Sequence, residues 1–295
     1  MNYLTNFDDY LQYLTYFLRH HRDVIRQFLH LKFTSEGNQT IFELEDEVKR
    51  FKNMDYLRKP EITVLNELRE NLRNMKMLDV GVGAGRTTGY FACLTKEYVG
   101  IDYSPSMIAA AQKKFQNYSK KISFLTMDAR NMTFFPDGYF DFVLFSYCGI
   151  DYVPHEDRLK ILSEIRRTLR KGGFFSFSTH NLNYFKRGYS VRLSRHRLRE
   201  IPWRLSFLLT NRLLNKEAWM ILRDSSRTPQ YLVIKEPEPP RYTLKTYVIT
   251  PLEQLKQLNA SGFAKIKVYS KEDGREIKNP SNAKSIYLFL LSQAI

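Results

Sequence analysis

Apolar and polar positions along the middle of the chain alternate between short buried runs and helical stripes. The first run, residues 75–80, predicts a buried strand, and Gly81, Gly83 and Gly85 follow it at once. Residues 86–94 then have the pattern of a helix. A strand, a glycine loop and a helix in this order open a nucleotide-binding α/β unit, because glycines let the backbone turn tightly and approach a ligand closely.

Further strands with helical patterns between them predict an α/β sheet. A strand over 98–101 ends in Asp102, and another over 122–126 leads to Asp128. The remaining predicted elements are strands over 140–146 and 174–178, helices over 158–169 and 250–263, and two final strands over 264–269 and 285–291.

The acidic residue at the end of the second strand narrows the choice of ligand. Asp102 lies about 20 residues past the glycine loop, where a carboxylate holds a ribose diol. This position leaves two cofactor classes, nicotinamide dinucleotides and S-adenosylmethionine. The spacing Asp79-x-Gly81-x-Gly83-x-Gly85 departs from the G-x-G-x-x-G of dinucleotide sites, which disfavours a nicotinamide oxidoreductase.

The series of motifs as a whole resembles the class I S-adenosylmethionine-dependent methyltransferases. Residues 79–85 are similar to their motif D-x-G-x-G-x-G, and residues 100–107 to their second-strand motif G-x-D-x-S-x-x-M. Residues 169–173 resemble their L-x-P-G-G turn, with Lys171 in place of the proline. The resemblance is strong over 65–180 and looser over 250–292. It implies an α/β fold with a doubly wound, seven-stranded, mostly parallel Rossmann-like sheet.

The same resemblance implies a cofactor and the residues that bind it. S-adenosyl-L-methionine would be the cofactor and S-adenosyl-L-homocysteine the product. The glycine loop would meet the methionine part, Asp102 the ribose, and Asp128 the edge of the adenine. The full predicted set is Asp79, Gly81, Gly83, Gly85, Asp102, Tyr103, Met107, Asp128, Ala129 and Ser146.

Methyl transfer from a sulfonium is an in-line displacement, so the protein must position the reactants and, for a hydroxyl acceptor, remove a proton. His180 directly follows the fifth strand and is the first candidate base, since an imidazole titrates near neutrality. A histidine that only hydrogen-bonds the backbone is the alternative. The other catalytic candidates are Asp151 and Tyr147, and the candidates for the acceptor pocket are Arg241, Tyr242 and Tyr247.

The chain divides into four expected parts. Residues 1–60 form a helical extension, 61–180 the cofactor-binding core, 181–247 an insertion after the fifth strand, and 248–295 the end of the core sheet. The insertion interleaves apolar groups with arginines, as in an amphipathic helix. It starts where ligands bind in such sheets, which favours a substrate lid, and a helix on a membrane surface is the alternative.

The net charge of +15 is concentrated in residues 185–227, which carry many more basic than acidic side chains. Such a segment suits a polyanion, an anionic membrane or an acidic substrate, or is an ordinary solvated face. Cys93 and Cys148 form no C-x-x-C pair, so no metal is expected. With neither a signal peptide nor a run of apolar residues long enough to span a bilayer, we expect a cytoplasmic protein.

These patterns favour an enzyme that transfers a methyl group from S-adenosylmethionine to an oxygen or nitrogen atom of a small-molecule acceptor. The alternatives are a methyltransferase for RNA or another macromolecule, which would use the basic insertion, and a protein that binds the cofactor without catalysis. Nucleic acid is not favoured as a partner, because no recognised RNA-binding module is present. The acceptor and the oligomeric state stay open.

Overall fold

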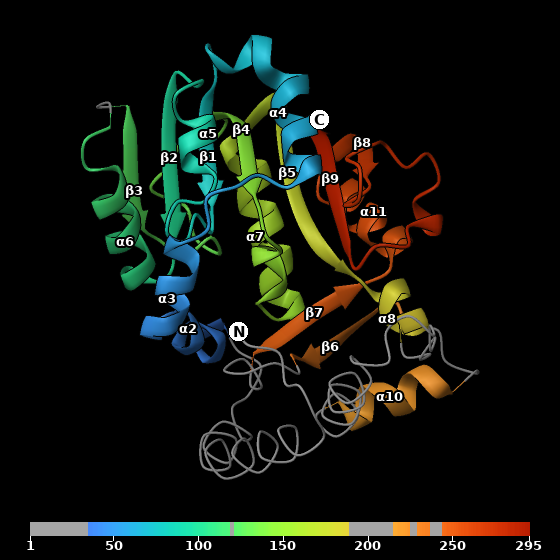
Figure 1. The fold of residues 1–295 in the computed structure, drawn as a ribbon. Helices are drawn as coiled ribbons and strands as arrows, with labels where there is room; N and C mark the ends of the chain where they lie inside the picture. The colour runs from blue at the N-terminus through green and yellow to red at the C-terminus, as the bar shows by residue number, and fades with distance from the viewer. Residues whose placement is uncertain (1–34, 119–120, 189–214, 225–228, 237–243) are drawn as a thin grey trace.

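The computed structural model describes residues 35–118, 121–188, 215–224, 229–236 and 244–295. Its centre is one sheet with strand order β3-β2-β1-β4-β5-β7-β6, in which β5 also pairs with β9 and β9 with β8 (Figure 1). The first five strands of this order are parallel, and β9 runs antiparallel to β5. The helices lie on both sides of the sheet, so the expected doubly wound α/β fold is confirmed.

The strands have the bounds β1 Lys76–Val80, β2 Glu97–Asp102, β3 Ile122–Thr126, β4 Phe140–Phe145, β5 Leu169–Asn181, β6 Tyr231–Lys235, β7 Lys245–Ile249, β8 Phe263–Tyr269 and β9 Tyr287–Ala294. The α-helices are α2 Ser35–Phe42, α3 Glu45–Lys52, α4 Lys59–Leu72, α5 Thr88–Phe91, α6 Pro105–Phe115, α7 His155–Thr168, α8 Leu182–Gly188, α10 Lys216–Arg223 and α11 Pro251–Ala260. Two 3₁₀ turns are η1 Gly149–Asp151 and η3 Pro280–Asn282.

The sheet has nine strands where seven are predicted. All seven predicted strands are present, and β6 and β7 are the additional pair. β6 lies in the insertion, which the sequence pattern predicts as helical, and β7 crosses the predicted end of the insertion at residue 247. They extend the sheet because β7 pairs in parallel with the end of β5 at His180 and Asn181. The insertion also contributes α8 and α10, while its residues 189–214 lie outside the described residues.

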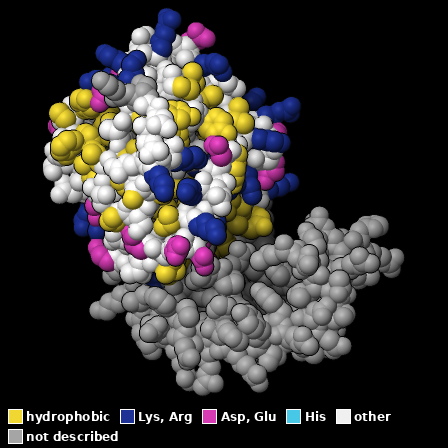
Figure 2. Space-filling model, turned by 60° about the vertical axis from the view of Figure 1, so that its left-hand side comes forward, with side chains coloured by type: hydrophobic (Ala, Val, Ile, Leu, Met, Phe, Trp, Pro, Cys, Tyr) yellow, Lys and Arg dark blue, Asp and Glu magenta, His cyan; other side chains and the backbone are white. Residues whose placement is uncertain are grey.

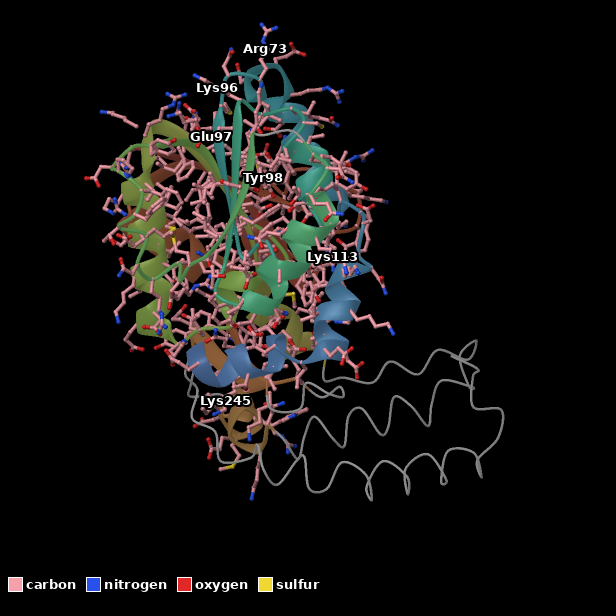
Figure 3. The ribbon with its side chains drawn as sticks, turned by 90° about the vertical axis from the view of Figure 1, so that its left-hand side faces the viewer. Arg73, Lys96, Glu97, Tyr98, Lys113 and Lys245 are labelled. Carbon is pink, nitrogen blue, oxygen red and sulfur yellow. The ribbon has the colours of Figure 1, made fainter. Side chains whose placement is uncertain are left out.

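Alternating side chains of each strand enter two different cores. Leu78 and Val80 of β1 pack in the cluster that contains α7 and α11, whereas Met77 packs in the cluster that contains α4 and α5. Successive side chains of a strand point to opposite faces, so both faces of this sheet are buried. Tyr98 of β2 shows this plainly, since its ring lies inside the molecule between strands and helices (Figure 3).

Ligands of such sheets bind at the edge where the parallel strands end. Figure 3 shows the two edges, because Lys96 and Glu97 at the start of β2 lie at one end of the described molecule and Lys245 of β7 lies at the other. Helices α2 and α3 lie at this second edge, close to β7 (Figure 1). Helices α2 and α3 and strand β7 therefore lie at the edge where β1, β2, β4 and β5 end.

Basic and acidic side chains are mixed on the face that Figure 2 draws. Most of the basic segment 185–227 lies outside the described residues. Within the described residues, none of the helices has the length and apolar character needed to cross a membrane.

Candidate functional site

A cavity of about 780 Å³, counted with its open mouth, lies at the edge where β1, β2 and β4 end. The glycine loop after β1 lines it, together with Phe42 of α2 and Phe51 of α3. The lining residues are Phe42, Phe51, Val80, Gly81, Gly83, Ile101, Asp102, Tyr103, Met107, Met127, Asp128, Ala129, Phe145, Ser146, Tyr147, Gly149, Tyr152, Val153 and Ile161. Nine of them belong to the predicted site residues, namely Gly81, Gly83, Asp102, Tyr103, Met107, Asp128, Ala129, Ser146 and Tyr147.

The glycine loop needs its glycines for two reasons. Gly81 and Gly83 have φ angles of +62° and +55°, which side chains rarely adopt. A Cβ on Gly81 would also lie 2.7 Å from the Phe145 ring, whereas one on Gly83 would stand in the space between the loop and Phe51. Gly85 is not among the lining residues. A Cβ there would lie 2.5 Å from the Phe115 ring, so that glycine allows α6 to pack against the loop.

Asp102 lies at the end of β2, where backbone N–H groups bind its carboxylate. Its two oxygens accept hydrogen bonds from the backbone N–H groups of Gly83 and Ser104, both at 2.9 Å. A carboxylate offers about four acceptor positions, so about two stay available on the cavity side. Burial raises the pKa of Asp102 to about 6, and the backbone hydrogen bonds only partly offset this effect.

Asp128 faces the same cavity but is held by a neighbouring cation. Arg130 donates to it from its backbone N–H, its Nε and its terminal nitrogen, over 2.6–2.8 Å. Arg130 also pairs with Asp157 of α7 and Glu36 of α2. One arginine therefore connects the adenine side of the predicted site to α2 and α7.

The Asp79 side chain does not face the cavity, which corrects its predicted contact with the amino group of the cofactor. It is buried on the other face of β1, where it accepts hydrogen bonds from Tyr98 at 2.6 Å and from Thr87. Strand alternation explains the difference, because Asp79 shares the face of Met77 while Val80 points to the cavity side. Burial raises the pKa of Asp79 to about 6.

Helices α2 and α3 supply part of the cavity that the sequence motifs do not indicate. Phe42 and Phe51 line it, and a buried amide fixes the helix that carries Phe42. Asn38 donates to the carbonyls of Tyr152 at 2.7 Å and Lys245 at 2.8 Å, and accepts from the Lys245 N–H at 3.1 Å. In the sequence, only the broad apolar pattern of residues 1–60 indicates such a cap.

A buried hydrogen-bond network that includes Ser146 joins α4 to the glycine loop. Glu61 of α4 binds the guanidinium of Arg86 through both oxygens, at 2.6 and 2.8 Å, and Ser146 hydrogen-bonds to both residues. All three side chains are buried. Ser146 thus lies at the cavity wall with its hydroxyl engaged. Sequence reasoning missed Glu61 and Arg86, since neither belongs to a motif.

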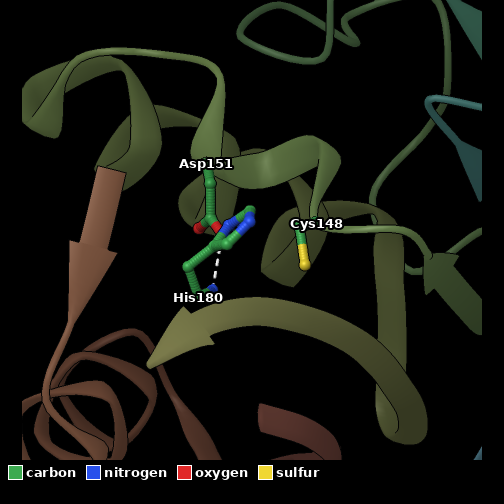
Figure 4. A group of neighbouring side chains, drawn as sticks. All are labelled: Cys148, Asp151 and His180. Carbon is green, nitrogen blue, oxygen red and sulfur yellow. Dashed lines mark hydrogen bonds and ion pairs between the residues drawn. The ribbon is translucent and has the colours of Figure 1, made fainter. Parts of the chain in front are cut away.

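Three buried side chains beyond β4 and β5 lie together, namely Cys148, Asp151 and His180, here called the thiol–imidazole–carboxylate cluster (Figure 4). His180 Nδ1 lies 2.7 Å from Asp151, which also accepts from the His180 N–H at 2.7 Å. The other Asp151 oxygen accepts from Arg158 and Thr179, both at 2.6 Å. All four acceptor positions of Asp151 are therefore occupied.

This saturation changes the predicted role of Asp151. A carboxylate with four internal hydrogen bonds cannot orient an acceptor directly, so it orients His180 instead. The sequence prediction names His180 and Asp151 as separate candidates, and the structure brings them into contact through His180 Nδ1. The His180 side chain also hydrogen-bonds to Cys148. The ligand atoms of the cluster lie within 4.8 Å of one another. Because the Asp151 oxygens are engaged, only the thiol and one imidazole nitrogen could serve a metal, too few for a zinc site.

The charge state of His180 follows from its neighbours. Burial alone would lower its pKa, but Cys148 and Asp151 outweigh burial and hold the pKa well above the ordinary value of a histidine. The backbone supports the arrangement at some cost, since Tyr147 and Cys148 both have positive φ angles, 57° and 59°. Consecutive non-glycine residues in this region are typical of functional sites.

Of the three predicted acceptor residues, only Tyr247 is among the described residues. Arg241 and Tyr242 lie outside the described residues. Tyr247 is fully buried in β7, where its hydroxyl lies 2.9 Å from His155 Nδ1 and 3.3 Å from the amide of Gln257. It is a packing residue that joins the inserted strands to α7 rather than a wall of the cavity.

Comparison with known proteins agrees with this geometry. Residues 77–173 match the family model described as a methyltransferase domain. A demethylmenaquinone methyltransferase of Thermus thermophilus is 34% identical over 33% of this chain and 44% of its own length. A ubiquinone biosynthesis O-methyltransferase of Bradyrhizobium is 30% identical over 44% of this chain and 50% of its own length. The chain thus spans about half the length of these curated relatives.

Solved structures show the same fold over a larger part of the chain. A SAM-dependent methyltransferase of Methanosarcina mazei aligns with 82% of this chain and 99% of its own, with a TM-score of 0.52 and 18% identity. The 1,6-didemethyltoxoflavin-N1-methyltransferase of Burkholderia thailandensis, solved with S-adenosylhomocysteine, aligns with 86% of this chain and 85% of its own, with a TM-score of 0.53 and 13% identity.

Proposed function

We propose that the protein transfers a methyl group from S-adenosylmethionine to an oxygen or nitrogen atom of a small-molecule acceptor. The basis is that this chain contains a class I S-adenosylmethionine-dependent methyltransferase domain. The observation that carries the proposal is the cavity itself. The glycine loop, Asp102 and the pair Asp128–Ala129 all line it, and this supports binding of the cofactor there.

The residues present fit the cofactor. The two unused acceptor positions of Asp102 suit the two hydroxyls of a ribose, and the space beside Gly83 admits a ligand that a side chain would exclude. Among the described residues the buried hydroxyl of Tyr103 has no hydrogen-bond partner, and it lies at this cavity. Asp128 keeps about one acceptor position for an adenine amino group. Met107 and Ala129 supply apolar contact.

S-adenosylmethionine, when bound, supplies an electrophilic methyl group. In our proposal His180 takes the proton of an acceptor hydroxyl or amine, and Asp151 holds the imidazole in place through Nδ1. Asp151 also stabilises the imidazolium that results. Tyr147 lines the cavity wall next to the cluster and is proposed to orient the acceptor.

The pH dependence of the reaction follows from the raised pKa of His180. Below this pKa the imidazole is protonated and cannot accept a proton. The turnover rate should therefore rise with pH, and the midpoint of this rise should lie above about 6.5, the ordinary pKa of a histidine. Glutamine at position 180 should remove this rise and lower the rate by about 10²–10⁴-fold, the range of general base catalysis.

We further propose that the insertion 181–247 covers the acceptor side. Its strand β7 pairs with β5 at His180, and Asn38 links it to the N-terminal helices. Deletion of residues 192–223 should abolish transfer while it spares cofactor binding. Full activity of that deletion would rule out a lid.

The test of the proposed function uses S-adenosylmethionine labelled on its methyl group, incubated with the protein and a fractionated lysate of its source cells. Label in the small-molecule fraction supports the proposal, and Asp102→Ala should remove it. Label in RNA or protein would contradict it and favour the macromolecule-directed alternative. Cofactor binding without any label would favour a binding protein.

The cysteines are both free, which fits a reducing compartment such as the cytoplasm.

A further inference from the structure

Two cationic side chains lie over the ring of Tyr287. The guanidinium carbon of Arg58 is 5.3 Å from the ring centroid, and Lys271 Nζ is 4.9 Å from it. Arg58 also lies 4.7 Å from the ring centroid of Tyr147. In the part of the chain that the structure describes, neither cation forms an ion pair, whereas the buried arginines Arg86 and Arg158 each have a carboxylate partner.

The three residues come from separate segments that meet at one place. Arg58 precedes α4, Lys271 follows β8, and Tyr287 begins β9. Tyr287 is paired with His180 in the sheet, and the two rings lie 5.0 Å apart between centroids. The two cations therefore lie at the same edge of the sheet as the proposed base. All three side chains are partly exposed, so a solute can reach them.

A cation over an aromatic ring keeps its N–H donors free. The attraction of the ring is worth only about 0.5–1 kcal/mol at exposed sites, and it acts on the face of the guanidinium rather than on its edge. The planar edge of arginine matches a carboxylate in a bidentate geometry. Arg58 thus lies against the rings of Tyr147 and Tyr287, and among the described residues its guanidinium has no hydrogen-bond acceptor.

The charge of the surroundings favours a single negative charge. Burial mainly raises the pKa of the Tyr287 hydroxyl, Glu236 raises it further, and Arg58 opposes this rise. Arg58, Lys271 and Glu236 together leave one net positive charge. A carboxylate balances this charge, whereas a dianionic phosphate would exceed it.

We propose that Arg58 and Lys271 bind a carboxylate group of the acceptor, which places the acceptor's nucleophilic atom near His180. The proposal rests on the proposed function, because it treats His180 as the neighbour of the reacting atom. The acceptor would then be a carboxylate-bearing molecule, anchored at Arg58 and Lys271 and methylated at an oxygen or nitrogen.

The test compares benzoate with benzyl alcohol, which has nearly the same shape but no charge. Binding of each to the full chain is measured at neutral pH by calorimetry, with and without S-adenosylhomocysteine. Benzoate should bind at least about tenfold more tightly, the value of one charge-assisted hydrogen bond. Arg58→Gln and Lys271→Gln should each remove most of this preference, and Arg58→Lys should restore part of it.

A matched control removes the same charge elsewhere. Lys278 is exposed in the segment after β8, and Lys278→Gln should leave the preference unchanged. Equal binding of benzoate and benzyl alcohol, or a preference that survives both Arg58→Gln and Lys271→Gln, would overturn the inference. Tighter binding of phenyl phosphate than of benzoate would overturn the choice of carboxylate.

The two proposals fail in different ways. If S-adenosylhomocysteine binds but the benzoate preference is absent, the proposed function stands and the carboxylate site falls. If the preference is present and S-adenosylhomocysteine does not bind, the carboxylate site stands and the proposed function falls.

Discussion

Cofactor affinity should depend on pH through one carboxyl group. Burial raises the pKa of Asp102 to about 6 in the protein without ligand. A ribose diol donates two hydrogen bonds, so its best partner is the ionised carboxylate. Below pH 6 the carboxyl must first lose its proton, and this loss opposes binding. The dissociation constant of S-adenosylhomocysteine should therefore rise as the pH falls through 6.

The magnitude follows from the titration curve. Each pH unit below the pKa weakens binding about tenfold, or about 1.4 kcal/mol, and above pH 7 the affinity reaches a plateau. Between pH 7 and pH 5 the dissociation constant should rise about tenfold. Near pH 6 about half a proton should be released for each ligand bound. Calorimetry in two buffers of different ionisation enthalpy measures both quantities.

The control is Asp102→Asn, which keeps the shape but does not titrate. It should bind more weakly at neutral pH by about 1.5–3 kcal/mol, the range of hydrogen bonds to charged groups, and its affinity should not change between pH 5 and pH 7. A flat profile for the unaltered protein would refute our account of Asp102. A slope that persists in Asp102→Asn would assign the titration to another group, with Asp79 first, because its pKa is also raised to about 6.

Three further changes test the site. Gly81→Ala should lower the free energy of unfolding, measured by urea denaturation, more than Gly172→Ala, because both glycines have positive φ but only a Cβ on Gly81 would meet a ring, at 2.7 Å. Equal losses of unfolding free energy in the two variants would contradict the clash. Arg158→Met should cost about 3–5 kcal/mol of stability by the same measurement, since it removes the arginine that pairs with the fully buried Asp151, and a loss below about 1 kcal/mol would contradict this. Treatment with EDTA should change neither the melting temperature nor methyl transfer, because the thiol–imidazole–carboxylate cluster is too poor in free ligands; a lower melting temperature would indicate a structural metal.

The cofactor side could be read from the sequence because its determinants are local. A strand, a glycine loop and an acid at the next strand end are short-range patterns, and parallel strands bring their carboxyl ends to one edge whatever the rest of the chain does. Gly81, Gly83, Asp102 and Asp128 therefore lie together as predicted. Asp79 is the exception within this local pattern. Its position in the motif is right, but strand alternation directs its side chain to the opposite face.

The acceptor side could not be read in this way, because its chemistry depends on partners far away in the chain. Asp151 follows β4 and looks like an acid open to an acceptor, but Arg158 of α7 and Thr179 of β5 occupy one oxygen and His180 the other. Its role is decided by these contacts, none of which a motif announces. The same holds for Arg58 and Lys271, which are ordinary surface cations until β9 brings the ring of Tyr287 into contact with both of them and with the ring of His180. If Asp151 were free, His180 would lack both its orientation and the charge that stabilises its protonated form, so the proposed base depends on the pairing that hides Asp151 from the acceptor.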